Sequence, residues 1–203
     1  MPLPTRLPVN IPLPEVMESI AVFALAVMLA PAALAQHQTF IVNPDTCEVK
    51  MTLKTTHEVV NGTFHIQSGT IEFDPDTPKM SGSVVVLAGS GKTGNGSRDN
   101  KMNKDILKVE QHATVVFEPK FYAGAIVRSG DSTIQVTGVL TLLGTPHEIT
   151  VPMLVRLDGA SATARAHFLV PYVQWGLKNP SFLIWKADND VAIDLFLTGR
   201  LFK

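Results

Sequence analysis

The sequence predicts an all-β protein, an antiparallel sandwich or barrel of about eight to ten strands with one short helix. Three observations lead to this prediction. Short segments alternate between apolar and polar residues, which is typical of strands with one buried face. Turn-forming Gly, Pro, Asn and Asp residues separate these segments at near-regular spacing. One long polar, glycine-rich segment, residues 89–110, interrupts the series and contains the one convincing helix pattern after residue 35.

The composition fits one globular domain or a tight pair of small domains. The 203 residues are 45% hydrophobic and 17% charged, which is too apolar for a disordered chain. The formal net charge of −1 creates no field that attracts nucleic acid, so no nucleic-acid partner is expected. The single cysteine, Cys47, excludes an internal disulfide.

The start of the chain has the pattern of an export signal. Ile20–Ala30 is an apolar run too short to span a bilayer and of the right length for the core of a signal peptide. Ala33-Leu34-Ala35 then supplies the small residues of a cleavage site. We therefore expect residues 1–35 to be a signal peptide, residues 36–203 to be the mature domain, and the location to be periplasmic or secreted. An uncleaved anchor and a later translation start remain alternatives.

The first half of the mature chain contains four strand-like segments. Cys47 to Lys54 alternates cleanly and places its apolar residues on one face. Residues 57–73 contain two strands, and we expect breaks near Asn61-Gly62 and near Ser68-Gly69, because these residues tolerate turn conformations. A turn at residues 74–78 leads into a fourth strand, Met80 to Leu87.

The second half continues in the same way. A strand at residues 114–118 is expected to end at Pro119, and residues 121–127 lead into a hairpin turn at 129–131. Asp158-Gly159 is a strong hairpin signal. The remaining expected strands are residues 132–143, 147–157, 162–170 and 191–202, with a loop containing aromatic residues at 171–180.

Spacing alone does not decide between a sandwich and a barrel. Two features favour a barrel with a hollow interior. Presumed inward positions such as Gly138 and the alanines of residues 162–166 are small, and small residues at the wall leave volume. About eight strands is also the size at which a barrel can hold one small ligand. The alternative is that large residues on the opposite wall fill this volume.

Gly89-Ser90-Gly91-Lys92-Thr93 superficially resembles a phosphate-binding loop. The motif requires a glycine five positions before Gly91, and Val86 stands there. A helix must begin at the Lys-Thr pair to meet the phosphate, whereas Gly94-Asn95-Gly96 follows here. We therefore expect no nucleotide ligand.

A short helix follows in the same segment, with Ser97 or Asp99 as the expected N-cap. An apolar stripe and a basic stripe lie at helical spacing, Met102, Ile106 and Val109 and, separately, Lys101, Lys104 and Lys108. With Arg98 one turn earlier, this pattern predicts a cationic rim beside an apolar cavity. An ordinary solvated helix face is the alternative.

The sequence contains no pattern that indicates catalysis or a metal site. Its six histidines show no His-x-His or His-x-x-x-His spacing and no cysteine pair lies near them. The Gly-x-Ser-x-Gly motif of serine hydrolases is also absent. We expect a protein that is not an enzyme, with no metal ligands.

Three segments carry a resemblance to a known family. They are the Ser97-Arg98-Asp99 loop with Met102, the turn Leu143-Gly144-Thr145-Pro146-His147, and Val170-Pro171-Tyr172-Val173-Gln174-Trp175-Gly176. With their surroundings, they are similar to the YceI-like family over about residues 40–202. The chain departs from the family at Thr46, where members more often have a histidine.

The resemblance implies an extended, antiparallel, eight-stranded, lipocalin-like barrel. We expect the short helix to lie at its mouth, because a short helix in such a barrel usually covers or flanks one opening. It implies an elongated pore that holds a polyisoprenoid chain, such as the tail of a quinone, and a periplasmic or secreted location. The partner would be an isoprenoid or other amphiphilic lipid, and no cofactor is implied beyond such a bound lipid or quinone. Transient membrane contact and a homodimer remain open.

A binding site for such a ligand needs an apolar wall and a mouth for the head group. The expected wall residues are Phe64, Ile66, Val115, Phe117, Val136, Leu140, Met153 and Phe168. The expected mouth residues are His57, Arg98, Asp99, Lys101, Met102 and Trp175. Each wall residue could instead belong to an ordinary core.

Two other functions remain open. One is a hydrolase or isomerase acting on a small amphiphile, which would need a polar pair such as His65 and Glu72 deep in the lumen. The other is a stress-linked interaction module, which an exposed apolar patch would support.

Overall fold

The computed structural model describes residues 37–203. The expected signal peptide, residues 1–35, lies outside the described residues. Within residues 37–203, no helix has the length and apolar character needed to cross a membrane.

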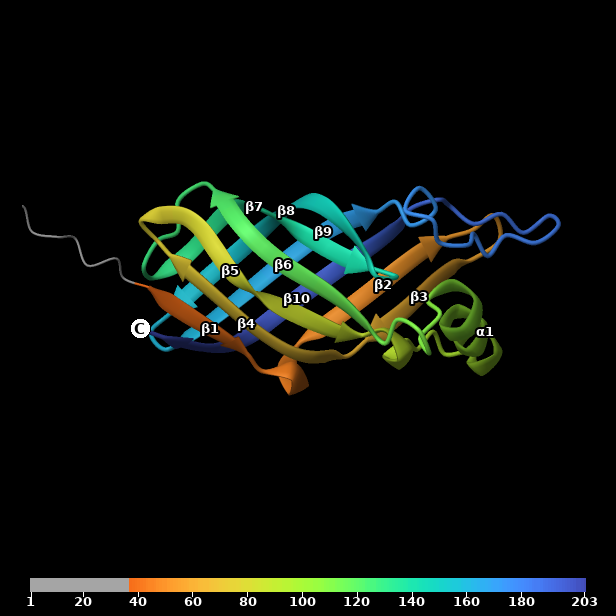
Figure 1. Ribbon diagram of the computed structural model, residues 1–203, viewed down its shortest axis with the longest axis horizontal. Helices are drawn as coiled ribbons and strands as arrows, with labels where there is room; N and C mark the ends of the chain where they lie inside the picture. The colour runs from red at the N-terminus through yellow and green to blue at the C-terminus, as the bar shows by residue number, and fades with distance from the viewer. Residues whose placement is uncertain (1–36) are drawn as a thin grey trace, which may run out of the picture. The chain divides into compact units, whose positions relative to one another are not determined.

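The described chain forms one antiparallel sheet that closes on itself as an elongated barrel (Figure 1). Its strands are β1 Gln38–Val42, β2 Glu48–Lys54, β3 Val59–Phe64, β4 Ile66–Asp74, β5 Thr77–Leu87, β6 Thr114–Ala123, β7 Gly130–Leu142, β8 Thr145–Asp158, β9 Ser161–Val170 and β10 Val191–Phe202. From β4 to β10, each neighbour in the barrel is the next strand in the sequence, apart from the helical segment between β5 and β6.

The ten strands make eight barrel positions. Strands β1 and β2 both pair with β10, at residues 199–202 and 192–196 respectively, so they form two halves of one broken strand. Strands β3 and β4 together form the next barrel position in the same way, since β4 pairs with β1 and β3 pairs with β2. The eight-stranded antiparallel barrel is therefore confirmed. A 3₁₀ turn, Pro44–Thr46, makes the first break, and Asn43 caps it.

Several expected elements are confirmed. Strand β2 buries Val49 and Met51, as the alternation over residues 47–54 predicts. Strand β10 has the predicted limits, and Gly159 makes the β8–β9 turn with φ of +59°.

Two predicted breaks are wrong, because β3 runs through Gly62 and β4 runs through Gly69. These glycines allow close packing rather than a turn. A Cβ at Gly69 would lie 2.5 Å from Val42 Cγ2, and one at Gly62 would lie 3.1 Å from Met51 Cγ. The strands instead separate at His65, between β3 and β4.

The predicted end of a strand at Pro119 is also wrong. Strand β6 continues to Ala123, and Pro119 lies at a shift in the register with β7, where a proline is tolerated. The partner of Pro119 is Gly138. A Cβ at Gly138 would lie 2.9 Å from the Phe117 ring, so Phe117 occupies the volume that this glycine was expected to leave.

The segment between β5 and β6 is helical in three short pieces: a 3₁₀ turn at Ala88–Ser90, α1 at Gly96–Lys101, and a π-helical turn, η3, at Met102–Ile106. The N-cap is Asn95, whose side chain accepts a hydrogen bond from the Arg98 N–H, and not Ser97 or Asp99 as predicted. Asparagine is as favourable an N-cap as serine or aspartate, and Asn95 precedes both Ser97 and Asp99 in the chain.

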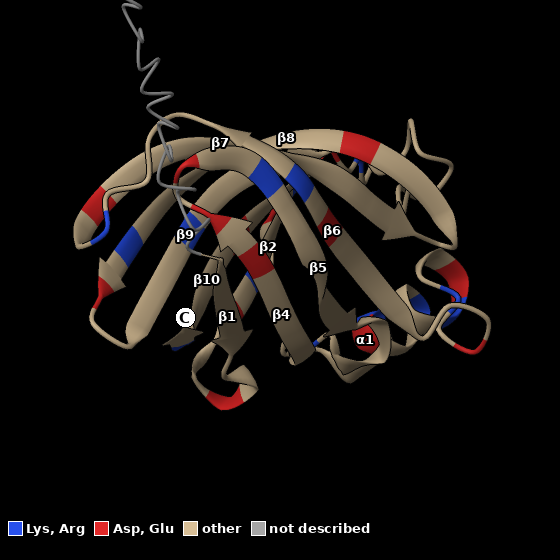
Figure 2. Cartoon of the chain, turned by 60° about the vertical axis from the view of Figure 1, so that its left-hand side comes forward, with Lys and Arg blue, Asp and Glu red and all other residues tan. Residues whose placement is uncertain are grey.

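The two predicted stripes do not continue along one α-helix, because the wider π turn follows α1. Met102 and Ile106 lie in that turn, whereas Val109 and Lys108 follow it. Lys108 has φ of +46°, which no helix accommodates. Charged positions of both signs are scattered over the strands and loops in Figure 2.

Candidate functional site

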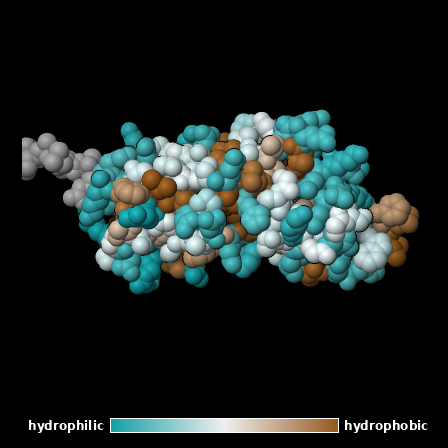
Figure 3. All heavy atoms as spheres, turned by 90° about the horizontal axis from the view of Figure 1, so that it is seen from below, coloured by the Kyte–Doolittle hydropathy of each residue, from teal (hydrophilic) through white to brown (hydrophobic). Residues whose placement is uncertain are grey.

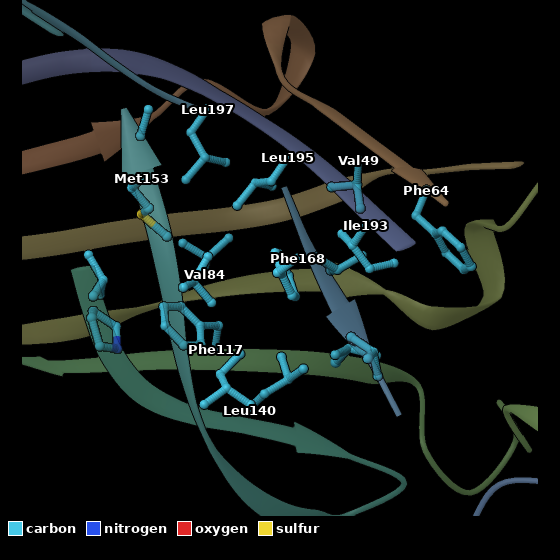
Figure 4. A pocket seen from close by; sticks show the side chains of 18 of the residues that line it. Val49, Phe64, Val84, Phe117, Leu140, Met153, Phe168, Ile193, Leu195 and Leu197 are labelled. Carbon is cyan, nitrogen blue, oxygen red and sulfur yellow. The ribbon is translucent and has the colours of Figure 1, made fainter. Parts of the chain in front are cut away.

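The barrel encloses a cavity of about 280 Å³. All ten strands contribute side chains to its wall, and so do η3 and the loop that joins β9 to β10. In Figure 4, Val84, Phe117, Leu140, Met153 and Phe168 converge on this space from different strands. The volume lies near the lower limit of ligand pockets, which are about 300–1,000 Å³. The hollow interior is therefore present.

The wall is almost entirely apolar. Among the lining residues of the described chain, Thr163 and Tyr172 are the only ones with a polar side chain. The Tyr172 hydroxyl donates a hydrogen bond to the Asp188 carbonyl at 2.7 Å, so it has a partner in the protein. Burial, together with the carboxylates of Asp188 and Asp190, raises the pKa of Tyr172 to about 12. The tyrosine therefore stays neutral at physiological pH.

The cavity is elongated. On β7, lining residues run from Ile134 to Leu142. At about 3.3 Å per residue, they extend for about 26 Å along the strand. Because strands in a barrel tilt by about 40°, the bore is about 20 Å long along the axis. A long, narrow, apolar space suits a chain-like ligand better than a compact one.

One end of the bore lies under the helical segment and the β9–β10 loop. Met102 and Ile106 of η3 line this end, together with Leu177 and Pro180 of the loop. We call it the helix end. Figure 1 shows α1 and the β9–β10 loop at this end of the barrel, with the C-terminus at the other.

Most of the expected wall residues line the cavity. They are Phe64, Val115, Phe117, Val136, Leu140, Met153 and Phe168. Ile66 is the one expected wall residue that does not line the cavity, and it is buried in the surrounding core. A register shift in β4 lies between Ile66 and Ser68, and beyond it Ile71 and Phe73 line the cavity.

Apart from Met153, the predicted wall contained none of the residues of β8 and β10 that line the cavity, although the pattern of these strands indicates them. Both strands alternate with a period of two, and the inward set can be read from that alternation. The missed residues are Ile149, Val151, Val155 and Leu157 on β8 and Val191, Ile193, Leu195 and Leu197 on β10.

Of the six expected mouth residues, Met102 alone lines the cavity. The Arg98 guanidinium does not face it, because NH1 donates to Glu58 Oε1 at 2.7 Å and Nε donates to Thr93 Oγ1 at 3.0 Å. Arg98 therefore ties α1 to the edge of β3. Lys101 is exposed on the outside of the helix.

Asp99 is a structural residue of the same segment. It is buried, and its carboxylate accepts hydrogen bonds from the Thr93 N–H at 2.9 Å and the Thr93 hydroxyl at 2.7 Å. The hydroxyl hydrogen bond holds the pKa of Asp99 below its usual value, and nearby Lys92 and Arg98 act in the same direction. The carboxylate therefore fixes the loop that precedes α1.

Two aromatic contacts involve the other expected mouth residues. Trp175 stacks on His147 with ring centroids 4.1 Å apart and an interplanar angle of 3°. His57 is exposed and contacts Trp185 of the β9–β10 loop at 4.3 Å. Three buried polar atoms, His147 Nε2, Asn103 Oδ1 and Gln38 Oε1 of β1, have no hydrogen-bond partner within residues 37–203, and none of these residues lines the cavity.

The polar pair that a catalytic lumen would need is not formed by His65 and Glu72. His65 is exposed, and the Glu72 carboxylate accepts a hydrogen bond from Ser81 with its side chain 45% exposed. In the described part of the chain, no group of three or more His, Cys, Asp or Glu side chains could hold a metal ion.

Comparison with known proteins gives consistent matches. The family model for the YceI-like domain matches residues 40–198. A UPF0312 protein from Pseudomonas savastanoi pv. phaseolicola is 29% identical over 144 residues, which cover 68% of this chain and 71% of that protein. A UPF0312 protein from Pseudomonas fluorescens is 27% identical over 148 residues, covering 68% and 74%.

Solved structures show the same fold. Burkholderia cenocepacia BcnA superposes with a TM-score of 0.64 at 20% identity, covering 78% of this chain and 99% of that one. A polyisoprenoid binding domain from Saccharophagus degradans, implicated in plant cell wall breakdown, superposes with a TM-score of 0.59 at 13% identity, covering 79% and 97%.

The fold and the cavity define a lipocalin-like barrel with an apolar bore. The extent of the family match then gives the identification: the chain belongs to the YceI-like family.

Proposed function

We propose that the protein is a periplasmic or secreted binding protein that carries or sequesters an amphiphilic isoprenoid lipid of the quinone or polyprenyl type. The observation that carries this proposal is the bore, whose wall offers two polar side chains and is otherwise apolar. A prenyl tail that leaves water for such a wall is stabilised by about 25 cal/mol per Å² of apolar surface buried. Binding therefore needs no reaction.

Family membership supports this assignment, since a solved domain with the same fold is described as polyisoprenoid-binding. The ligand's polar head would remain at the helix end. Asn103 and His147 near this end have buried polar atoms without partners among the described residues, although neither residue lines the bore itself. The expected signal in residues 1–35 supports export, and N-terminal sequencing of the protein recovered from the periplasm tests cleavage after Ala35.

Organic extraction followed by mass spectrometry tests the ligand class. The protein is purified without detergent, extracted, and compared with the same preparation of a variant whose bore is blocked, Ala164→Phe. We expect a prenyl lipid in the extract of the wild-type protein and much less in that of the variant. No prenyl lipid from the wild-type protein, together with no binding of added farnesol or a short-tail quinone, would contradict the proposal.

A further inference from the structure

The loop that joins β9 to β10 ends in an apolar turn, Phe182–Trp185, that projects from the helix end of the barrel (Figure 1). The backbone N–H groups of Phe182 and Trp185 each donate to the carbonyl of the other residue at 2.9 Å. The exposed fractions are 65% for Phe182, 74% for Leu183, 71% for Ile184 and 49% for Trp185. Figure 3 shows hydrophobic atoms protruding at the right-hand end of the molecule.

Hydrogen bonds from the barrel side fix the turn in this exposed position. The Thr56 N–H donates to the Lys186 carbonyl at 2.9 Å, and the Thr56 hydroxyl donates to the Ile184 carbonyl at 3.2 Å. Behind the turn, the Ala187 N–H donates to Ser181 Oγ at 2.8 Å. A turn with three of its four carbonyls satisfied, those of Phe182, Ile184 and Trp185, can enter a low-dielectric medium at lower cost than an open loop.

Two lysines flank the turn in the sequence. Lys178 and Lys186 flank it and are exposed, and no acidic residue occurs between them in the sequence. Asp188 follows three residues after Trp185, and the Glu58 carboxylate, near Thr56, is paired with Arg98. Aromatic residues at the level of the head groups and lysines that meet anionic lipids are typical of membrane-docking segments.

The size and shape of the turn favour a bilayer over a second copy of the chain. Four side chains of this size, two of them aromatic, would cover on the order of 500 Å² if fully buried. A stable protein–protein interface buries about 800 Å² per partner. The turn also continues directly from the wall of the bore, since Leu177 and Pro180 line the cavity.

We propose that the Phe182–Trp185 turn is a membrane-docking element that inserts into bilayers with anionic head groups and presents the helix end of the bore to the membrane. Docking to a membrane is a property separate from binding of the isoprenoid ligand, and it is measured in the absence of that ligand. Only the consequence, that a lipid passes between bilayer and bore beside this turn, rests on the proposed function.

Flotation with lipid vesicles tests the docking element, using the mature chain, residues 36–203. Phosphatidylcholine vesicles are compared with vesicles of equal parts phosphatidylcholine and phosphatidylglycerol. The test variant is Leu183→Asn with Ile184→Asn. Because Leu183 has φ of +50°, which asparagine tolerates better than leucine, we expect this variant to fold. The matched control is Leu169→Asn. Leu169 is an apolar residue of β9 that is 60% exposed and lies outside the turn.

We expect the wild-type chain to float with the anionic vesicles and the Leu183→Asn, Ile184→Asn variant to bind at least tenfold more weakly, with Leu169→Asn unchanged. Lys178→Gln with Lys186→Gln should weaken binding to anionic vesicles only. In a Trp175→Phe background, Trp185 is the remaining tryptophan, and its emission should shift to shorter wavelength on docking.

Three results would overturn the proposal. They are no flotation of the wild-type chain, equal flotation of the wild-type and turn variants, and a concentration-dependent dimer that the turn variant abolishes. Farnesol binding in the absence of vesicles separates this proposal from the previous one. A turn variant that still binds farnesol but not vesicles supports both, whereas a wild-type chain that floats but binds no farnesol contradicts only the proposed function.

Discussion

Blocking the bore is the sharpest perturbation that the structure offers. Ala164 lines the cavity on β9, and its cross-strand partners Val155 and Leu197 line it too. A phenylalanine at this position would extend into the open space rather than into packed side chains. The change Ala164→Phe should therefore remove ligand volume while leaving the barrel intact.

The expected loss of affinity follows from the apolar groups that are displaced. If the new ring excludes one five-carbon isoprene unit, the loss is about 4 kcal/mol at about 0.8 kcal/mol per buried carbon. Since about 1.4 kcal/mol corresponds to a factor of ten, Kd should rise by a factor of several hundred. The free protein should gain stability, because each 100 Å³ of cavity that is filled is worth about 2.4 kcal/mol.

Equilibrium dialysis with labelled farnesol measures the affinity, and urea denaturation measures stability. Ala164→Leu is the smaller step and should give an intermediate Kd. Leu169→Phe, on the outer face of the same strand, is the control and should bind as the wild type does. Wild-type affinity in Ala164→Phe would refute binding in the bore. A large loss of stability in Ala164→Phe would instead contradict the claim that the space around Ala164 is open.

Three further predictions concern the fold. Gly138→Ala should destabilise the barrel by about 1–3 kcal/mol in urea denaturation, because the new Cβ would lie 2.4 Å from a backbone oxygen. Gly96→Ala is the control and should not destabilise the barrel, because no atom lies within 4 Å of its Cβ position. The pKa of Asp99 is lowered, so its stabilising contribution is present at neutral pH and lost as pH falls through that pKa, below 3.8. Urea midpoints of Asp99→Asn should be lower than wild type at neutral pH and should fall less in acid. Both tyrosines of the chain have raised pKa values: burial is the main cause for Tyr122, and the pKa of Tyr172 is about 12. The contribution of each tyrosine to stability is therefore full below pH 10, and it is lost as pH rises through the pKa of that tyrosine in the folded protein. The tyrosinate absorbance should accordingly rise with its midpoints above the ordinary value of 10, and a midpoint at 10 or below would contradict the burial of that ring.

Much of the fold could be predicted from local patterns. Alternation with a period of two identifies β2, β9 and β10, since one face of each strand is buried by the barrel. The positions where prediction failed depend on neighbours far away in the sequence. Gly69 looks like a turn residue, but its role is to make room for Val42 on β1.

The wall of the site was predicted better than its mouth. Inward positions such as Val136 and Leu140 follow from strand periodicity once a hollow barrel is expected. Arg98 and Asp99 carry the charges expected of a ligand site, but Glu58 and Thr93 satisfy them, and no sequence pattern records those contacts. The apolar turn at residues 182–185 resembles a buried strand in sequence, and its projection from the barrel is visible only in three dimensions.

The central claim, that the bore holds an isoprenoid tail, is tested most directly by NMR of the protein loaded with farnesol and labelled at alanine methyl groups. Ala162 and Ala164 line the cavity, whereas Ala192 lies on the outward-facing set of β10. We predict intermolecular nuclear Overhauser effects from the prenyl chain to the Ala162 and Ala164 methyls and none to that of Ala192. Contacts confined to Ala192 or to other outer residues, with none to the two lining alanines, would contradict the claim.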